Sequence, residues 1–472
     1  MCKGDDPTCS EYEAHRRQFE ADMAKERRSF LQSDFAAKGG AAALAAGGLS
    51  LVSPGLARAS ARRRPAQARH HYLPANADTV HWGFFSRHLP PQVEVDSGDF
   101  VTIETLTHQA SDDHERMIEG DPGAESVYLW TADKKGVARR GAGEGDGKGL
   151  GVHICTGPVL VRGAEPGDIL EVRIVDVTPR PSANPKFSGL AFGSNAAANW
   201  GFHYNDFLDG DTREVVTIYE VDASGERNWA RAVYNFRWPT VVDPSGVAHP
   251  TIDYPGLPVD HAKTARNWDV LKGVRIPIRP HFGVMGLAPK EADWVNSVPP
   301  SYTGGNIDNW RIGKGATLYY PVAVPGALLS VGDPHASQGD SELCGTAIEC
   351  SLTGTFQLIL HKAADLAGTA LEPVDFPMIE TPEEWVLQGF SYPNYLADLG
   401  PNAQSEIFQK SSVDLAMRDA FRKMRRFLMT AKKLTEDEAI SLMSIAVDFG
   451  ITQVVDGNWG VHAIVRKSIF PS

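Results

Sequence analysis

Cysteine is scarce in this chain, and its few copies are not arranged in pairs. The 472 residues include five cysteines and no Cys-x-x-Cys motif; Cys155, Cys344 and Cys350 form the odd set that follows the N-terminal region. An odd set does not make a disulfide framework, although one pair can still form outside the cytoplasm. A Gly-x-Ser-x-Gly elbow and a phosphate-cradling glycine-rich loop are also missing. These absences argue against a disulfide scaffold, a serine-elbow hydrolase and a P-loop enzyme.

Positive charge is also in short supply. The chain has 46 Lys and Arg against 59 Asp and Glu, a net charge of −13 at pH 7. Such an acidic surface disfavours nucleic acid and anionic membranes as partners. After the N-terminal region, no apolar stretch is long enough to span a bilayer. We therefore expect a soluble protein that binds neither nucleic acid nor, once its signal is removed, a membrane.

Residues 1–59 have the layout of a secretory signal. Arg27-Arg28 precede a weakly apolar, Ala- and Gly-rich run from Ala36 to Val52, which is followed by the small-x-small pattern Ala57-Arg58-Ala59. This arrangement is typical of a cleavable signal, and the paired arginines followed by x-Phe-Leu indicate the twin-arginine pathway. The alternative is an Ala-rich amphipathic helix with two incidental arginines.

Cleavage near Ser60 would leave residues 60–70 as a disordered linker, because residues 61–69 are basic and contain proline. The mature protein is then expected in the periplasm or outside the cell. Twin-arginine export carries folded proteins, often ones that acquire a cofactor in the cytoplasm. Export by this route therefore gives independent support for a bound metal.

Residues 71–410 have the pattern of a large β-rich catalytic core. Short apolar runs occur at Val93–Val95, Phe100–Glu104, Val159–Val161 and Ile169–Val175, and the last of these alternates as a half-buried strand does. The 45 glycines and 31 prolines supply many tight connections. We predict a mainly β protein with a large antiparallel sandwich or barrel-like core, α+β overall because of a C-terminal helical segment.

The C-terminal part, residues 411–472, differs in kind. Apolar residues recur at helical spacing from Val413 to Leu428, and a capping box at Thr435–Glu438 opens a second helix that we expect to run to Phe449 and end at Gly450. A closing strand over Val461–Val465 should return to the core. Residues 131–150 are expected to form a mobile loop and residues 377–410 an irregular connection.

The densest group of acids and imidazole lies between positions 333 and 342. Asp333, His335, Asp340 and Glu342 are separated by glycines and a proline, which favour a shaped loop over a solvated helix face. Carboxylates and a histidine this close repel or desolvate one another unless a cation or a reacting proton justifies them. The segment is therefore the strongest functional-site signal in the chain.

Asp333 and His335 would project to the same side of an extended segment and could bind one divalent ion together, with zinc as the expected metal. Glu342 or Asp340 could then act as the general base. Asp308 and Glu104 are candidate ligands from elsewhere in the chain. Each residue also has a structural interpretation: the aspartates as turn residues, His335 as a buried structural histidine, and Glu104 as a paired strand carboxylate.

Other residues are candidates for substrate contacts. His108, within the second acid–histidine group at residues 108–114, His153 and Asn306 are assigned to substrate binding, although His108 fits a solvated loop as well. A rival mechanism would use Cys344 or Cys155 as nucleophile. It is disfavoured because a thiol requires a depressed pKa and a positioned base, and cysteine in such segments usually fills core space.

Several segments occur together in an order that resembles a known family. They are His81-Trp82-Gly83, Pro90-Pro91, Val95–Asp99, Thr102–Thr105, His153–Pro158, Gly163–Asp168, Gly283–Pro289, Gly304–Asp308 and the cluster at 333–342. Over most of residues 78–360 the chain is similar to the acetamidase/formamidase family. The resemblance implies a β-rich, metal-associated enzyme that hydrolyses short amides.

Two features depart from that family. The familiar members are cytoplasmic, whereas we expect this chain to be exported, and residues 108–114 differ from the form seen in short-chain amidases. We expect hydrolysis of a formamide- or acetamide-like linear amide to carboxylate and ammonia by metal-activated water, in a homo-oligomer. The alternatives are an exported binding protein of the same fold and an amidase for a larger or cyclic amide.

Overall fold

The computed structural model describes residues 68–130, 151–225, 227–244, 246–252, 256–372 and 374–471. The predicted signal region 1–59 and the predicted loop 131–150 lie outside these residues, as do residues 60–67 of the predicted linker. His70, the last linker position, already belongs to a strand, β1, which pairs with Phe100 and its neighbours. Within the described part of the chain, no helix combines the length and the apolar character needed to cross a membrane.

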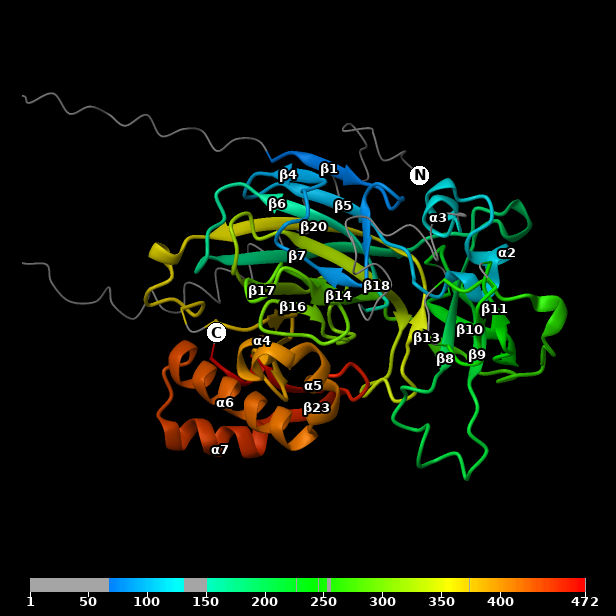
Figure 1. The fold of residues 1–472 in the computed structure, drawn as a ribbon. Helices are drawn as coiled ribbons and strands as arrows, with labels where there is room; N and C mark the ends of the chain where they lie inside the picture. The colour runs from blue at the N-terminus through cyan, green and yellow to red at the C-terminus, as the bar shows by residue number, and fades with distance from the viewer. Residues whose placement is uncertain are drawn as a thin grey trace, which may run out of the picture.

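Most of the described strands form two large sheets (Figure 1). The nine-stranded sheet contains, in spatial order, β1 (His70–Leu73), β5 (Phe100–Glu104), β20 (Leu352–His361), β7 (Ile169–Pro179), β17 (Thr317–Pro321), β21 (Met378–Glu380), β22 (Glu384–Phe390), β24 (Gly460–Arg466) and β23 (Val447–Gln453). The eleven-stranded sheet contains, in order, β13 (Ile276–Pro277), β10 (Trp229–Arg237), β9 (Val215–Asp222), β8 (Leu190–Ala197), β19 (Ile348–Glu349), β18 (Leu329–Ser337), β14 (His281–Gly286) and β16 (Gly304–Asn306), with β6 (Ile154–Val161) joining β18 to β2 (Val80–Trp82) and β4 (Val93–Val95).

Pairing between the named strands is antiparallel, except that β1 runs parallel to β5 and β4 runs parallel to β6. Two short ribbons lie outside the large sheets: β11 (Val241–Val242) with β12 (Ala248–His249), and β15 (Val295–Asn296) with β3 (Phe84–Phe85). The predicted fold class, a mainly β antiparallel sandwich, is confirmed.

Period-two alternation places the nine-stranded sheet between two apolar layers. On β22, Val386 and Phe390 join the cluster shared with the other sheet, whereas Trp385 and Leu387 join a second cluster on the opposite face. Successive side chains of a strand point to opposite faces, so a strand buried on both sides reads as a continuous apolar run. The arrangement is a sandwich with a third, helical layer.

The third layer comes from the C-terminal part of the chain (Figure 1). The α-helices among the described residues are α2 (His114–Met117), α3 (Pro122–Val127), α4 (Tyr395–Asp398), α5 (Ala403–Lys410), α6 (Val413–Ala431) and α7 (Glu436–Ala446). Helix α6 packs its apolar stripe, including Ala416, Ala420 and Met424, on the outer face of the sheet. The predicted capping box at Thr435 and Glu438 opens α7.

Two predictions about this region are wrong. Residues 377–410 are not an irregular connection, since they contain β21, β22, α4 and α5. Helix α7 ends at Ala446 rather than Phe449, because Val447 starts β23, which pairs along β24. Gly450 does not end the helix; it lies within β23, where a Cβ would stand 2.4 Å from His462 Nε2. The closing strand predicted over Val461–Val465 is present as β24.

Gly389 sets the distance between α6 and the sheet. A Cβ at this position would stand 2.3 Å from the backbone nitrogen of Ala420 and 2.6 Å from the carbonyl oxygen of Ala416. Gly389→Ala should therefore push the helix outward and lower the free energy of unfolding by about 1–3 kcal/mol in a denaturant titration. Gly339→Ala is the control, since nothing lies within 4 Å of its added Cβ. Equal stability of the two variants would contradict this packing.

Candidate metal centre

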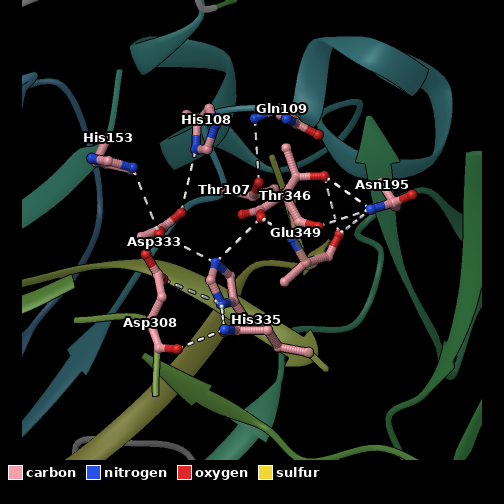
Figure 2. Close-up of polar contacts among 12 residues, drawn as sticks. Thr107, His108, Gln109, His153, Asn195, Asp308, Asp333, His335, Thr346 and Glu349 are labelled. Carbon is pink, nitrogen blue, oxygen red and sulfur yellow. Dashed lines mark hydrogen bonds and ion pairs between the residues drawn. The ribbon is translucent and has the colours of Figure 1, made fainter. Parts of the chain in front are cut away.

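The acid–histidine cluster is assembled around β18, from segments far apart in the sequence. Asp333 and His335 lie on β18, and Glu349 lies on the neighbouring strand β19, where its Cα is in register with that of His335. Asp308 follows β16, and His108 follows β5. Figure 2 shows these side chains pointing toward one another. Each of the five is at most 7% exposed.

One nitrogen of His335 faces two carboxylates. His335 Nε2 lies 3.2 Å from Asp333 Oδ2 and 3.2 Å from Glu349 Oε1. Two other histidines also face Asp333: His108 Nδ1 lies 3.5 Å from Asp333 Oδ1, and His153 Nε2 lies 3.7 Å from Asp333 Oδ2 (Figure 2). Asp333 is thus the carboxylate on which the imidazoles converge.

The other ring nitrogen of His335, Nδ1, contacts the side chains of His281 and Gln338. This nitrogen lies 3.2 Å from His281 Nε2 and 3.1 Å from Gln338 Oε1, while His281 Nδ1 donates to the carbonyl oxygen of Arg279. The Gln338 amide nitrogen donates to the Asp308 carbonyl, which leaves Oε1 as the acceptor toward His335. This network places a proton of His335 on Nδ1. Burial alone would lower the pKa of His335, but the facing Glu349 and Asp333 raise it well above its usual value. Such a contact needs a proton or a cation between the partners.

Burial and mutual repulsion strongly perturb the carboxyl groups of the cluster. Burial, with the charge of Asp333 beside it, raises the pKa of Asp308 to about 7. Burial, with Asp308 as neighbour, raises the pKa of Glu342 well above its usual value. Burial alone would raise the pKa of Asp333, but the facing imidazoles, led by His335, hold it well below its usual range. The imidazoles thus stabilise the ionised form of Asp333, whereas Asp308 and Glu342 favour the neutral form unless a cation binds beside them.

Among the described residues, histidines rather than lysine or arginine face the carboxylates of the cluster. No lysine or arginine is among the described residues that line the cavity next to the cluster, although five carboxylates of the cluster and of the loop after β23 do so. They are Asp308, Asp333, Glu342, Glu349 and Asp456, and the carboxylate of Asp112 lines the same cavity. Buried acids that outnumber their basic partners are strongly disfavoured unless they bind a cation or protons.

The backbone is strained where it presents these acids. Asp308, Asp333 and Glu342 have φ angles of 52°, 48° and 47°, in the left-handed region that non-glycine residues rarely adopt. Such conformations cost of the order of 1–3 kcal/mol each and concentrate at functional sites. The surrounding sheets thus hold three carboxylates in an arrangement that the local chain disfavours.

Gly283 on β14 makes room for the cluster. A Cβ at this position would stand 2.3 Å from Asp308 Oδ1, 2.5 Å from Asp333 Oδ2 and 2.7 Å from His335 Cε1. All three distances are shorter than van der Waals contact. The neighbouring strand must therefore carry glycine for the two carboxylates and the imidazole to approach one another.

The residues present fit a divalent cation. Five buried polar atoms of the cluster, and one of the neighbouring Asp456, have no hydrogen-bond partner among the described residues. They are His108 Nδ1, Asp308 Oδ1, Asp333 Oδ1, His335 Nε2 and Glu349 Oε2, with Asp456 Oδ2. Two groups offer ligand atoms that all lie within 4.8 Å of one another: His108, Asp333 and Glu349, and next to them Asp308, His335 and Glu342. Mixed imidazole and carboxylate sets of this kind suit zinc and similar transition metals.

The structure brings most of the predicted site residues together but leaves three elsewhere. Glu104 ends β5 on its outer side, where it accepts hydrogen bonds from Tyr72 and Ala75. Asp340 is 44% exposed and accepts from the Trp310 indole, so it faces away from the cluster. Asn306 is buried in β16 but does not line the cavity. His108 and His153, predicted as substrate contacts, both lie against Asp333.

Sequence reasoning missed Glu349, Asp456 and Gly283. Glu349 lies between Ile348 and Cys350, and a carboxylate flanked by buried apolar residues was a usable signal.

The thiol alternative is not favoured by the geometry. Burial raises the pKa of the Cys155 thiol, and Cys344 contacts Asn195 and Thr346 rather than a histidine.

Fold and site together define a β-sandwich protein with a buried acid–histidine cluster beside a cavity. The profile of the acetamidase/formamidase family matches residues 150–296 and 290–471, and the chain belongs to this family. Its fold is similar to that of acetamidase from Bacillus halodurans, with a TM-score of 0.55 at 21% identity over 84% of this chain and 98% of that one.

Two relatives show the extent of the sequence similarity. The chain is 33% identical to acetamidase of Mycolicibacterium smegmatis over 261 residues, which cover 50% of this chain and 60% of the relative. It is 33% identical to formamidase of Methylophilus methylotrophus over 215 residues, which cover 42% of this chain and 49% of the relative. The matched part of the chain therefore spans about half to three fifths of these relatives.

Gly283→Ala tests whether the close approach of the ligands matters. The added methyl group should force Asp308 and Asp333 apart and weaken metal binding by about 10–100-fold, as loss of support around a metal site does. Metal content after dialysis against a competing chelator, read by elemental analysis, measures this. Gly339→Ala is again the control and should retain metal as the parent does. Unchanged binding in Gly283→Ala would show that the ligand set lies elsewhere.

Proposed function

We propose that this protein hydrolyses the C–N bond of an amide, releasing ammonia and a carboxylate, at a divalent cation held in the candidate metal centre. The observation that carries the proposal is the group of buried carboxylates around His335 Nε2, next to a cavity, in which Asp308, Asp333 and Glu349 each keep one oxygen without a hydrogen-bond partner among the described residues. Membership of the acetamidase/formamidase family supports the reaction type, and formamide and acetamide are the first substrates to test.

Each residue of the cluster has a role in this proposal. His335, Asp333, Glu349 and Asp308 would hold the ion, with zinc as the expected metal, and His108 would add a further nitrogen ligand. A bound divalent cation lowers the pKa of water and polarises a carbonyl. Behind it, Gln338 and His281 keep His335 in the tautomer that directs Nε2 toward the ion.

Glu342 is the proposed general base. It lines the cavity and its carboxylate lies within 4.8 Å of that of Asp308 and of a His335 ring nitrogen, so a water bound there would face it. It would accept a proton from the attacking water while the C–O bond forms, then return a proton to the nitrogen as the C–N bond breaks. Water and amide thus give the carboxylic acid and ammonia, which become carboxylate and ammonium when the acid passes its proton to the ammonia, with no other reactant.

Removing the central ligand should remove both metal and activity. His335→Ala should lose bound metal and lower ammonia release by at least about 100-fold, because Asp333 and Glu349 lose the nitrogen that completes the set. Elemental analysis and an ammonia assay measure the two effects. His88→Ala, at an exposed histidine, is the control and should match the parent.

Glu342→Gln separates the base from the ligands. It should keep the metal and lower kcat by about 100- to 10,000-fold, the usual contribution of a positioned proton acceptor.

Full activity in His335→Ala would contradict the proposed hydrolysis at this site. No turnover of any amide by the metal-loaded parent would favour a binding protein of the same fold.

We also propose that the protein is exported in folded form, since Arg27-Arg28 and the apolar run that follows have the twin-arginine pattern. Replacing both arginines with lysine should retain the protein in the cytoplasm, as measured by cell fractionation. A parent chain found only in the cytoplasm of a host with this pathway would contradict the proposal.

A further inference from the structure

The cavity beside the metal centre is larger than a formamide or acetamide molecule. Its volume is about 280 Å³. A water molecule takes about 30 Å³ of the liquid, so an amide of four heavy atoms occupies on the order of 100 Å³. Pockets that bury drug-sized ligands begin near about 300 Å³. The space suits a substrate with a substantial side group.

The walls of this cavity are apolar and extend outward from the acidic cluster. Trp200, Trp238, Ile252, Leu257 and Phe408 line it together with the cluster residues. The cluster is buried, whereas Trp200 is 37% and Phe408 is 47% exposed. The cavity therefore leads from an apolar, partly exposed region to a polar inner end.

Both indoles have their polar atoms occupied by the protein itself. Trp200 Nε1 donates to the carbonyl oxygen of Gly345 at 2.9 Å, and Trp238 Nε1 donates to that of His249 at 3.4 Å. What these side chains offer a ligand is therefore carbon surface. Such walls favour aliphatic or aromatic groups and give a small polar amide little to bind.

One buried carboxylate ties the walls together. The Glu214 carboxylate accepts hydrogen bonds from the backbone nitrogens of Asn199 and Ile252, both at 2.9 Å. The backbone carbonyl oxygen of Glu214 accepts a third hydrogen bond from the backbone nitrogen of Trp238. Three loops that carry wall residues are thus anchored at one point. The apolar wall is a built part of the site rather than a chance contact of loops.

We infer that the preferred substrate is a primary amide with a bulky apolar acyl group, such as an arylalkyl or medium-length alkyl chain, seated between Trp200, Trp238 and Leu257. This inference rests on the proposed amide hydrolysis and narrows its substrate class. The carbonyl carbon lies at the acidic end, and the apolar group replaces water along the walls.

The first experiment compares acetamide, hexanamide and phenylacetamide with the metal-loaded protein, using ammonia release. One methylene in a hydrophobic pocket is worth roughly 10–200-fold in kcat/KM. We expect kcat/KM for hexanamide and phenylacetamide to exceed that for acetamide by at least about tenfold. Equal or better use of acetamide would overturn the inference and leave the proposed hydrolysis standing. No turnover of any of the three would overturn the hydrolysis and the inference with it.

Substitutions of the tryptophans that line the cavity test whether its apolar wall causes the preference for bulky amides. Trp238→Ala and Trp200→Ala should each lower the ratio of kcat/KM for phenylacetamide to that for acetamide by about tenfold. Trp238→Phe should recover most of that ratio and serves if Trp238→Ala fails to fold. Trp268→Ala, at a 58% exposed tryptophan that does not line the cavity, should keep the parent ratio. An unchanged ratio in both wall variants would contradict the inference.

A binding measurement supports the kinetics without turnover. Calorimetry with the products should show phenylacetate binding at least about tenfold tighter than acetate, with a negative heat-capacity change from the buried apolar surface. Loss of that difference in Trp238→Ala is expected. Equal affinity of the parent for the two acids would count against the apolar wall as a substrate site.

Discussion

The contact of His335 Nε2 with two buried carboxylates is the interaction on which this account depends. Asp333 and Glu349 lie 3.2 Å from that nitrogen, and its partner nitrogen is engaged from behind by His281 and Gln338. An imidazole nitrogen that faces two buried acids requires a proton or a cation between the partners, and the two acids raise the pKa of His335 well above its usual value. The other acids of the cluster increase the need for a proton or a cation, because no lysine or arginine lines the cavity within the described part of the chain.

The sandwich supplies the rigidity that such an arrangement needs. Strand β18 is paired with β14, β6 and β19, so Asp333 and His335 are held in place although Asp333 has a left-handed backbone. Gly283 on β14 removes the one Cβ that would separate the carboxylates. Packing of the two sheets thus offsets local strain and electrostatic repulsion, both of which oppose folding of the isolated segment.

Local patterns predicted much of the fold and half of the site. Alternating apolar runs such as Ile169–Val175 became strands, and Asp333 and His335 could be paired because they lie two residues apart on one strand. Glu349 could not be placed, since it reaches His335 through strand pairing. Asp340 and Glu342 share a loop, and the left-handed backbone at Ser341 and Glu342, with Glu342 lining the cavity and Asp340 44% exposed, does not follow from the local sequence. The end of α7 was missed because pairing of β23 with β24 overrides helix propensity.

Anomalous X-ray diffraction from crystals of the protein, purified without chelator, tests the central claim most directly. Data collected on both sides of the absorption edge of the metal found by elemental analysis should give a peak among His335 Nε2, Asp333 and Glu349, at about 2.0–2.2 Å from each if the metal is zinc. An occupied cluster would confirm that a cation resolves the repulsion. A cluster without a peak, in a protein that still hydrolyses an amide, would contradict the account.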